Sequence, residues 1–304
     1  MPEDGSQDRR ALVLGLCAVL FWSTAATAFK LALADLSVIQ LVSIAVSVSA
    51  IVLIGYLAAR GQLSALLLAI KRRTLFYLVM ATVNPLIYYS ILLAAYDALP
   101  AQQAQTINYT WAIMLALLSI PFLGQRLQVR DWTAVFLGYI GVVIIATEGR
   151  PWDLAFTNLN GVLLALVSTV VWAVFWLLNT RNDDDPAVAL CANFCLAAPA
   201  AFFLTFLLGD AWPASAQGYL SAVYVGLFEM GVTWLLWSYA LRLASNVSRV
   251  ANLIFLAPVL SLGFIATILG ESINPATILG LALILPGIVL QQRGQRRQSL
   301  SSSD

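Results

Sequence analysis

A single carboxylate, Glu229, lies in the middle of a long apolar stretch, GLFEMGVTW (226–234). Burying a charged side chain in such surroundings is costly, so a functional role is the first expectation for it. Thr233 and Trp237 follow at helical spacing, which predicts one polar and aromatic helix face. Glu229 would pair with the ammonium group of a ligand or with Lys30, or would exchange a proton for the ligand. The remaining alternative is a neutral side chain that is hydrogen-bonded to a neighbouring helix.

Amide side chains gather in the segment AQQAQTINYTW (101–111). Gln105 and Asn108 are three residues apart and share a helix face, and Trp111 lies one residue off that face. Buried amides need a protein or water partner. They therefore serve either as hydrogen-bond links between helices or as a lining that holds an amino or carboxylate group.

The segment VNPLIYYS (83–90) contains a proline inside an apolar stretch. Pro85 lacks a backbone donor, so it predicts a helix kink. Asn84 and Tyr88 are four residues apart beside this kink. The kink either places these polar groups at a binding site or only shapes the helix packing.

Trp172 and Trp176 are four residues apart in a further apolar stretch, away from its ends. They would either face lipid or form an aromatic wall. Such a wall would contact an aromatic or aliphatic ligand and attract an ammonium group.

The composition defines the elements that must position these residues. Of 304 residues, 61% are hydrophobic, 10% are charged and none is histidine. A soluble enzyme and a nucleic-acid binder are thereby disfavoured. Without histidine, histidine-based catalysis and common metal sites are excluded. The three cysteines, Cys17, Cys191 and Cys195, are interpreted as packing residues, and neither a metal nor a cofactor is predicted.

Ten apolar stretches predict an all-α polytopic membrane protein. Residues 1–10 and 293–304 form polar tails on either side of these stretches. The predicted spans are residues 11–34, 36–59, 74–97, 100–123, 130–147, 158–180, 187–209, 217–241, 245–269 and 273–292.

Basic residues in the connecting segments predict the orientation. With the N-terminus in the cytoplasm, fourteen of the sixteen Lys and Arg residues fall on the cytoplasmic side, and only Arg150 falls outside. The pattern predicts a bacterial-type inner (plasma) membrane protein with both termini cytoplasmic. The fourteen are Arg9, Arg10, Arg60, Lys71, Arg72, Arg73, Arg126, Arg130, Arg181, Arg242, Arg249, Arg293, Arg296 and Arg297.

The two halves of the chain resemble each other. Residues 11–36 align with 161–186 without a gap, and residues 121–146 resemble 267–292. In the second pair, Leu123-Gly124 aligns with Leu269-Gly270, and Gly141 aligns with Gly287. The chain therefore divides into two five-helix repeats, 11–150 and 151–292. Since five is odd, the repeats must have inverted topology, which is typical of secondary carriers.

These halves, each with a late LG(E/Q) and a glycine-rich closing helix, resemble the EamA repeats of the drug/metabolite transporter superfamily. The motifs FWST (21–24), INYTW (107–111) and LGQ (123–125) are similar to those of the bacterial aromatic amino-acid exporters. The resemblance implies a ten-helix basket whose cavity is lined mainly by the first, third, fourth, sixth, eighth and ninth spans. It also implies export of aromatic and other hydrophobic amino acids. Gln125 departs from the usual Glu of this motif, whereas Glu271 keeps it in the second half.

The sequence predicts a secondary transporter, not an enzyme, that uses alternating access to a central cavity. Its expected partners are a small-molecule substrate, such as an amino acid or metabolite, and the lipid bilayer, with no nucleic acid. A primary pump is opposed by the absence of a GxxxxGK phosphate loop. The alternatives are a carrier of another metabolite or drug, and a scramblase or structural subunit. The pattern leaves the direction of transport, the coupling ion and the oligomeric state open.

Overall fold

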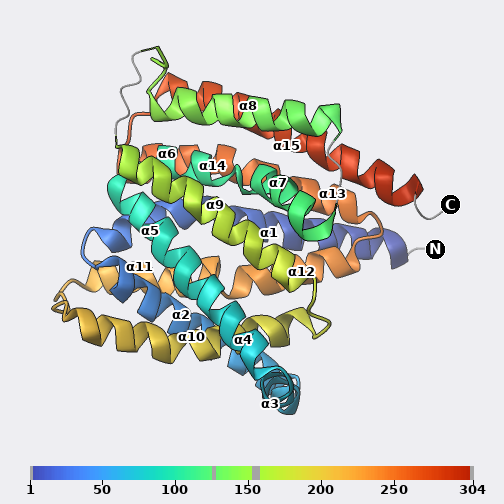
Figure 1. The fold of residues 1–304 in the computed structure, drawn as a ribbon. Coiled ribbons are helices and arrows are strands. Elements are labelled where there is room, and N and C mark those ends of the chain that lie inside the picture. The colour runs from blue at the N-terminus through green and yellow to red at the C-terminus, as the bar shows by residue number, and fades with distance from the viewer. Residues whose placement is uncertain (1–2, 125–127, 153–157, 302–304) are drawn as a thin grey trace. The chain divides into compact units, whose positions relative to one another are not determined.

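A computed structural model describes the chain except for residues 1–2, 125–127, 153–157 and 302–304. The predicted motif residue Gln125 lies outside the described residues. The described residues form helices, turns and loops, with no strand among them (Figure 1). Among the described residues, eight helices are long and apolar enough to cross a membrane. Two shorter apolar helices, Asp131–Ala146 and Pro275–Val289, lie at the positions of the fifth and tenth predicted spans. The all-α polytopic fold is thereby confirmed.

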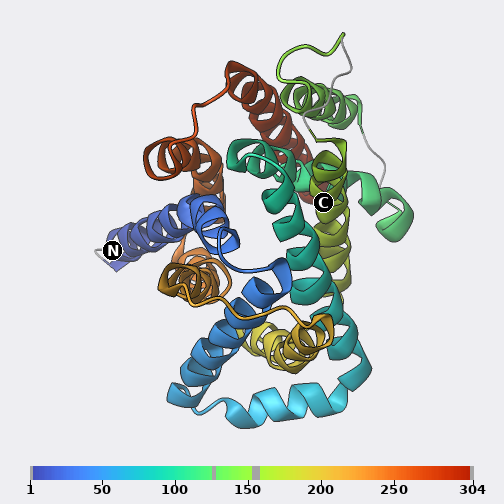
Figure 2. The ribbon, with the colours of Figure 1, turned by 90° about the vertical axis from the view of Figure 1, so that its left-hand side faces the viewer.

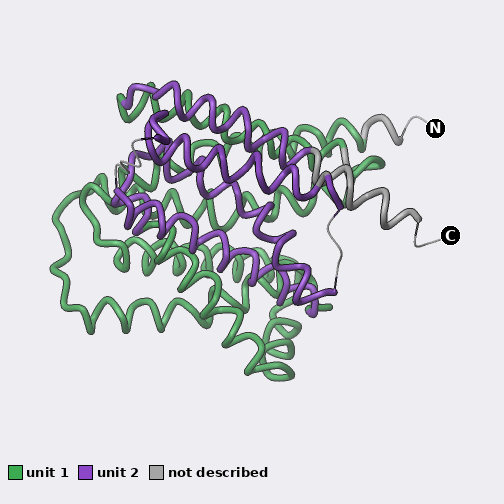
Figure 3. Tube along the Cα trace, turned by 45° about the horizontal axis from the view of Figure 1, so that its top comes forward, with its two compact units in different colours: residues 1–93, 182–270 green, residues 94–181, 271–304 purple. Residues whose placement is uncertain are grey.

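The helices form two compact units, and each unit draws on both halves of the sequence (Figure 3). Unit 1 comprises Met1–Leu93 and Asn182–Gly270, and unit 2 comprises Ala94–Arg181 and Glu271–Asp304. Helix α5 (Tyr88–Ala98) contributes residues to both.

In unit 1, α2 packs against α10, and α1 packs against α11, α12 and α14. Small residues allow α1 and α12 to approach closely, because Ala11 and Ala240 are fully buried there beside Val250. The other helices of unit 1 have the following bounds: α1 (Glu3–Leu33), α2 (Val38–Ala59), α3 (Leu63–Arg72), α4 (Thr74–Ala81), η1 (Thr82–Ile87), α10 (Pro186–Leu208), α11 (Ala216–Tyr224), η2 (Val225–Glu229), α12 (Val232–Leu243), α13 (Val247–Ala251), η3 (Asn252–Phe255), α14 (Leu256–Phe264) and η4 (Ile265–Leu269).

In unit 2, α8 packs along α15, and α9 packs against α6 and α7. Figure 1 shows α8 and α15 as neighbouring helices. The bounds in unit 2 are α6 (Ala101–Asn108), α7 (Trp111–Leu123), α8 (Val129–Ala146), α9 (Leu159–Asn179) and α15 (Pro275–Ser301).

Three of the predicted spans are interrupted inside the apolar region. The kink at Pro85 is confirmed, because Asn84 has non-helical backbone angles (φ −144°, ψ 117°) within η1. A turn at Tyr109 and Thr110 separates α6 from α7, and a turn at Met230 and Gly231 separates η2 from α12. These last two breaks were not predicted, since no proline marks them.

The repeat seen in the sequence also relates two close contacts between α8 and α15 of unit 2 to each other. A β-carbon on Gly280 would lie 2.8 Å from the carbonyl oxygen of Gly141, and one on Gly287 would lie 3.2 Å from that of Ala134. The sequence alignment adds 146 to a first-half number (124 + 146 = 270), so Gly141 corresponds to Gly287 and Ala134 corresponds to Gly280. One contact therefore maps onto the other when the halves are exchanged, as an inverted repeat requires.

A second pair of contacts follows the other aligned segment, for which the offset is 150 (11 + 150 = 161). In unit 1, Asp8 accepts hydrogen bonds from the backbone N–H and hydroxyl of Ser245, at 2.9 and 2.6 Å. In unit 2, the equivalent residue Asn158 donates to the carbonyl of Ala98 at 3.2 Å. Each residue thus ties the start of a half's first helix to the segment that precedes a fourth helix, at Ser245 in one case and at the end of α5 in the other.

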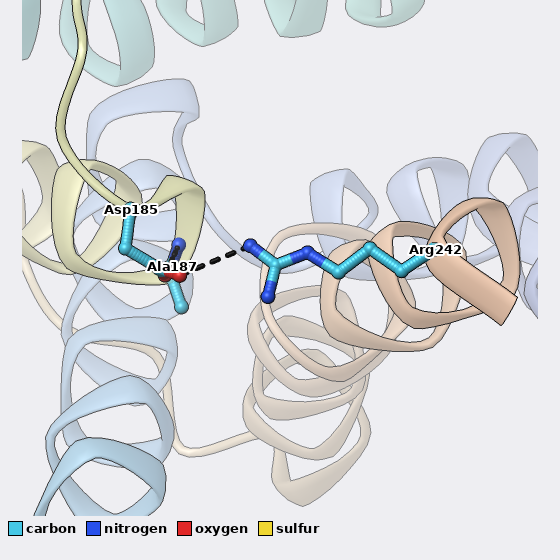
Figure 4. A network of polar contacts seen from close by, with 3 residues as sticks. All are labelled: Asp185, Ala187 and Arg242. Carbon is cyan, nitrogen blue, oxygen red and sulfur yellow. Dashed lines mark hydrogen bonds and ion pairs between the residues drawn. The ribbon is translucent and has the colours of Figure 1, made fainter.

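A polar contact fixes two helix ends of unit 1 (Figure 4). Asp185 caps α10 by accepting from the N–H of Ala187 at 2.8 Å, and it accepts from the guanidinium of Arg242 at 3.0 Å. Burial opposes ionisation of Asp185, but the hydrogen bonds from Arg242 and Ala187 outweigh it and lower the pKa of this carboxyl.

Replacing Asp185 with Ala is expected to destabilise the chain by about 1–2 kcal/mol, because both the cap and the ion pair are lost. Asp185→Asn should cost less, since Asn also caps helices. The lowered pKa makes the carboxylate's contribution complete above the unfolded pKa and lost as pH falls through the folded pKa. Thermal unfolding of the wild type and both variants, from about pH 7 to about pH 3, measures this. A gap between wild type and Asn variant that persists at low pH would contradict the assignment.

Candidate functional sites in the two units

Unit 1 contains the partly buried carboxylate that the sequence singles out. Glu229 is the last residue of η2, and its Oε1 accepts a hydrogen bond from the Tyr89 hydroxyl at 3.3 Å. Tyr89 is buried on α5, and its ring meets that of Tyr88 edge-on at 4.9 Å. The predicted residue Tyr88 therefore lies beside the tyrosine that holds the carboxylate. The Tyr89 hydroxyl occupies one carboxylate oxygen of Glu229, and the carboxylate can still accept hydrogen bonds from an ammonium group.

Aromatic rings lie on the same element as this carboxylate. Phe228, the residue before Glu229, stacks on Phe21 of α1 at 4.5 Å between ring centroids. Tyr224 lies 4.7 Å from Phe228, and its hydroxyl is 2.7 Å from that of Thr24. The residue next to the acidic group thus belongs to a cluster of rings that could contact an apolar side chain. The sequence analysis did not identify Phe21, Thr24 or Tyr224 as site residues.

Glu229, Thr233 and Trp237 do not share one continuous helix face. The turn at Met230 and Gly231 changes the helix register between the first residue and the other two. Thr233 is fully buried and donates to the carbonyl of Phe228, so its hydroxyl serves the interrupted backbone.

Trp237 belongs to a second aromatic group of unit 1. Its ring and that of Trp234 each lie 5.3 Å from Trp22. Trp237 also packs on the buried cluster of Ala11, Ala240 and Val250. This group joins α1 to α12 through apolar contact.

The remaining predicted residues of unit 1 occupy helix ends and breaks. Asn84 is 3% exposed, and its side-chain oxygen has no hydrogen-bond partner within the described part of the chain. Lys30 lies in the last turn of α1 and is partly buried. Their roles at a binding site stay predictions.

The predicted amides of unit 2 surround the break between α6 and α7. Gln105 is buried within α6, and Asn108 is its last residue. The Asn108 side chain donates to the Ser168 hydroxyl of α9 at 2.9 Å. This bond between helices is one of the two roles that the sequence analysis left open for the amide.

The predicted tryptophans of unit 2 form one cluster with Trp111. Trp172 lies 6.5 Å from Trp111 and 6.0 Å from Trp176, both edge-on, and stacks on Phe175 at 5.4 Å. Since Trp172 is only 7% exposed, it does not face lipid. Three aromatic rings from α7 and α9 are therefore gathered around the buried indole of Trp172.

Glu271, in the second LG(E/Q) motif, has a structural task within unit 2. Its Oε1 accepts from the N–H of Ala101 at 2.9 Å, at the start of α6. Gln102 donates to the carbonyl of Ser272 at 2.9 Å and accepts from the N–H of Asn274 at 2.8 Å. The Glu271 carboxylate thereby satisfies the Ala101 N–H, a donor at the N-terminus of α6 that has no partner within the helix.

With this geometry in view, comparison with known families identifies the class of protein. The EamA-like transporter family matches residues 9–147 and 159–291, one match in each sequence half. The chain belongs to the EamA-like transporter family, which confirms the resemblance drawn from its motifs. It is accordingly a multi-pass membrane protein and a transporter of small molecules.

Individual relatives share about a quarter of their residues with this chain. It is 25% identical to the uncharacterized transporter YvbV of Bacillus subtilis over 244 residues, which cover 77% of each chain. It is also 25% identical to the aromatic amino acid exporter YddG of Ancylobacter novellus, over 69% of this chain and 73% of the relative. A probable terminal-alkyne amino-acid exporter of Streptantibioticus cattleyicolor is 27% identical over 66% of this chain and 68% of its own.

A crystal structure matches the fold. It has a TM-score of 0.65 and 25% sequence identity, and the match covers 95% of this chain and 98% of the other.

Proposed function

We propose that this chain is a secondary carrier that exports aromatic and other hydrophobic amino acids and related small metabolites. The observation that carries the proposal is the Glu229–Tyr89 pair, together with the ring of the preceding residue, Phe228, which stacks on Phe21. An amino acid with a large apolar side chain offers the matching groups, an ammonium for the carboxylate and a ring or alkyl group for the rings. Two relatives, an aromatic amino acid exporter and a probable terminal-alkyne amino-acid exporter, favour the same class of substrate.

The transport cycle that we propose is alternating access without ATP, in an inner membrane and with both termini in the cytoplasm. Glu229 pairs with the substrate ammonium. In unit 2, Trp111, Trp172 and Trp176 offer apolar surface, and Gln105 and Asn108 offer amide groups. In unit 1, the other proposed binding residues are Asn84, Tyr88, Thr233 and Trp237. The excess of basic residues on one side of the spans supports the orientation.

The proposal is tested by counterflow in liposomes that contain only this protein. Vesicles loaded with unlabelled phenylalanine should accumulate external labelled phenylalanine transiently, without ATP. Leucine and tryptophan inside the vesicles should support the same exchange, whereas glutamate should not, because its side-chain carboxylate would be buried against the aromatic rings. Equal exchange with glutamate would contradict the proposed substrate class. Exchange of sugars or nucleosides alone would favour a carrier of another metabolite.

A further inference from the structure

Helix α3 is a short helix that the sequence analysis treated as a loop between two spans. It follows α2 at Gly61, whose positive φ of 66° reverses the chain and favours glycine. The N–H of Gln62 bonds to the carbonyl of Leu57 and closes the end of α2. Figure 2 shows α3 running across the ends of α2 and α4, and Figure 1 shows it almost end-on. α3 therefore does not continue either span.

One side of α3 packs on unit 1, and the other side exposes leucines. Leu66 and Ala69 are buried, and the helix packs against α10. Leu63, Leu67 and Leu68 are 40, 69 and 56% exposed. Because the flanking helices α2 and α4 belong to membrane spans, lipid is the neighbour available to these leucines at the end of the spans.

The same helix carries basic residues that form no ion pair with an acid of the described residues. Four cations and no acid occur between Asp35 and Asp97, namely Arg60, Lys71, Arg72 and Arg73. Lys71 and Arg72 are exposed in the last turn of α3. The ion pair found in the described part of the chain is elsewhere, between Arg242 and Asp185.

The arginines next to α3, and Asp184 and Asp185 before α10, are engaged in other contacts. Arg73 lies over the Phe76 ring at 4.0 Å, and Arg60 lies over the Tyr56 ring at 5.2 Å. At the start of α10, Asp184 accepts from the Tyr77 hydroxyl at 2.6 Å. Lys71 and Arg72 are thus the exposed cations of this region that are available to an external anion.

We propose that α3 lies in the membrane interface and that Lys71 and Arg72 bind the headgroups of anionic phospholipids, such as phosphatidylglycerol. The exposed leucines enter the acyl boundary, while the two cations reach the headgroup phosphates. An anionic leaflet attracts such basic residues, whereas a neutral leaflet does not. The inference concerns a lipid partner and does not depend on which substrate is transported.

The test is titration of the purified full chain in detergent with phosphatidylglycerol, followed by native mass spectrometry. Lys71→Gln/Arg72→Gln should weaken binding about ten- to thirty-fold, since each basic residue near an anionic surface contributes about a factor of five. Phosphatidylcholine binding should be the same in both proteins. An unchanged melting temperature shows that the variant is folded, as expected for two exposed side chains.

Two further arms can overturn the proposal. Arg9→Gln/Arg10→Gln removes two exposed arginines from α1 and is the matched control. An equal loss in this control would show diffuse charge attraction rather than a site on α3. Leu67→Gln should also weaken phosphatidylglycerol binding. If Leu67→Gln binds normally while millimolar inorganic phosphate displaces the lipid, the cations bind free phosphate and the lipid proposal is wrong.

Discussion

Replacement of Gly280 with Ala is expected to destabilise the protein by about 1–3 kcal/mol, because the new methyl group has no room between α15 and α8. It would overlap the side chain of Ile145 and lie 2.8 Å from the carbonyl oxygen of Gly141. Ile145 can change rotamer, but the backbone oxygen cannot move unless the two helices separate. Thermal unfolding of the purified protein in detergent measures the loss.

Two other glycines provide a graded comparison. At Gly287 the added β-carbon would lie 3.2 Å from the Ala134 carbonyl, so Gly287→Ala should cost less than Gly280→Ala. Gly55, in the middle of α2, has open space around it, so Gly55→Ala should be neutral or stabilise the helix by up to about 1 kcal/mol. The expected order of melting temperatures is therefore Gly55→Ala, Gly287→Ala and Gly280→Ala, from highest to lowest. Equal values for the three variants would contradict close packing of α8 on α15.

Glu229→Gln is expected to reduce phenylalanine counterflow at least tenfold, because losing a charge-assisted hydrogen bond to an ammonium costs about 1.5–3 kcal/mol. The amide keeps the shape of the carboxylate and can still accept the Tyr89 hydroxyl, so folding should be preserved. Glu229→Asp is the matched variant, since it keeps the charge, and it should retain more transport than the glutamine variant.

A substrate analogue without nitrogen separates the possible roles of Glu229. In the wild type, phenylpropionate should compete with phenylalanine far less well than leucine does, because it has no ammonium group. In Glu229→Gln this discrimination should disappear. If counterflow and discrimination survive in Glu229→Gln while accumulation driven by a pH gradient is lost, the residue carries protons and does not hold the ammonium. If nothing changes, Glu229 is only a hydrogen-bond partner of Tyr89.

Hydropathy and repeated motifs were sufficient to predict the ten helical stretches and their inverted symmetry. Both depend on local composition and on motif spacing, which survive in a single sequence. The aligned glycines Gly141 and Gly287 even identified positions where helices approach closely. The break at Asn84 was predictable because Pro85 cannot continue the helix hydrogen bonds.

The arrangement around Glu229 could not be predicted from helical spacing. The turn at Met230 and Gly231 depends on tertiary packing, so the expected alignment with Thr233 and Trp237 was lost. Tyr89 approaches Glu229 from 140 residues away, and nothing local distinguishes it from Tyr88. Helix α3 was missed because its ten residues are too short for a span and were interpreted as a loop.

The contact between Gly141 and Gly280 also sets an order of events during synthesis. α8 ends at Ala146 and α15 begins at Pro275, so 128 residues (274 − 146) are translated between them. At about 5–20 residues per second, the ribosome needs roughly 6–26 s for this interval. Throughout it, α8 resides in the membrane with its small-residue face uncovered by its final partner. Membrane insertion of α15 is consequently the step that completes unit 2, and a chain terminated before Pro275 leaves the glycine face of α8 open to proteolysis or to wrong helix pairing.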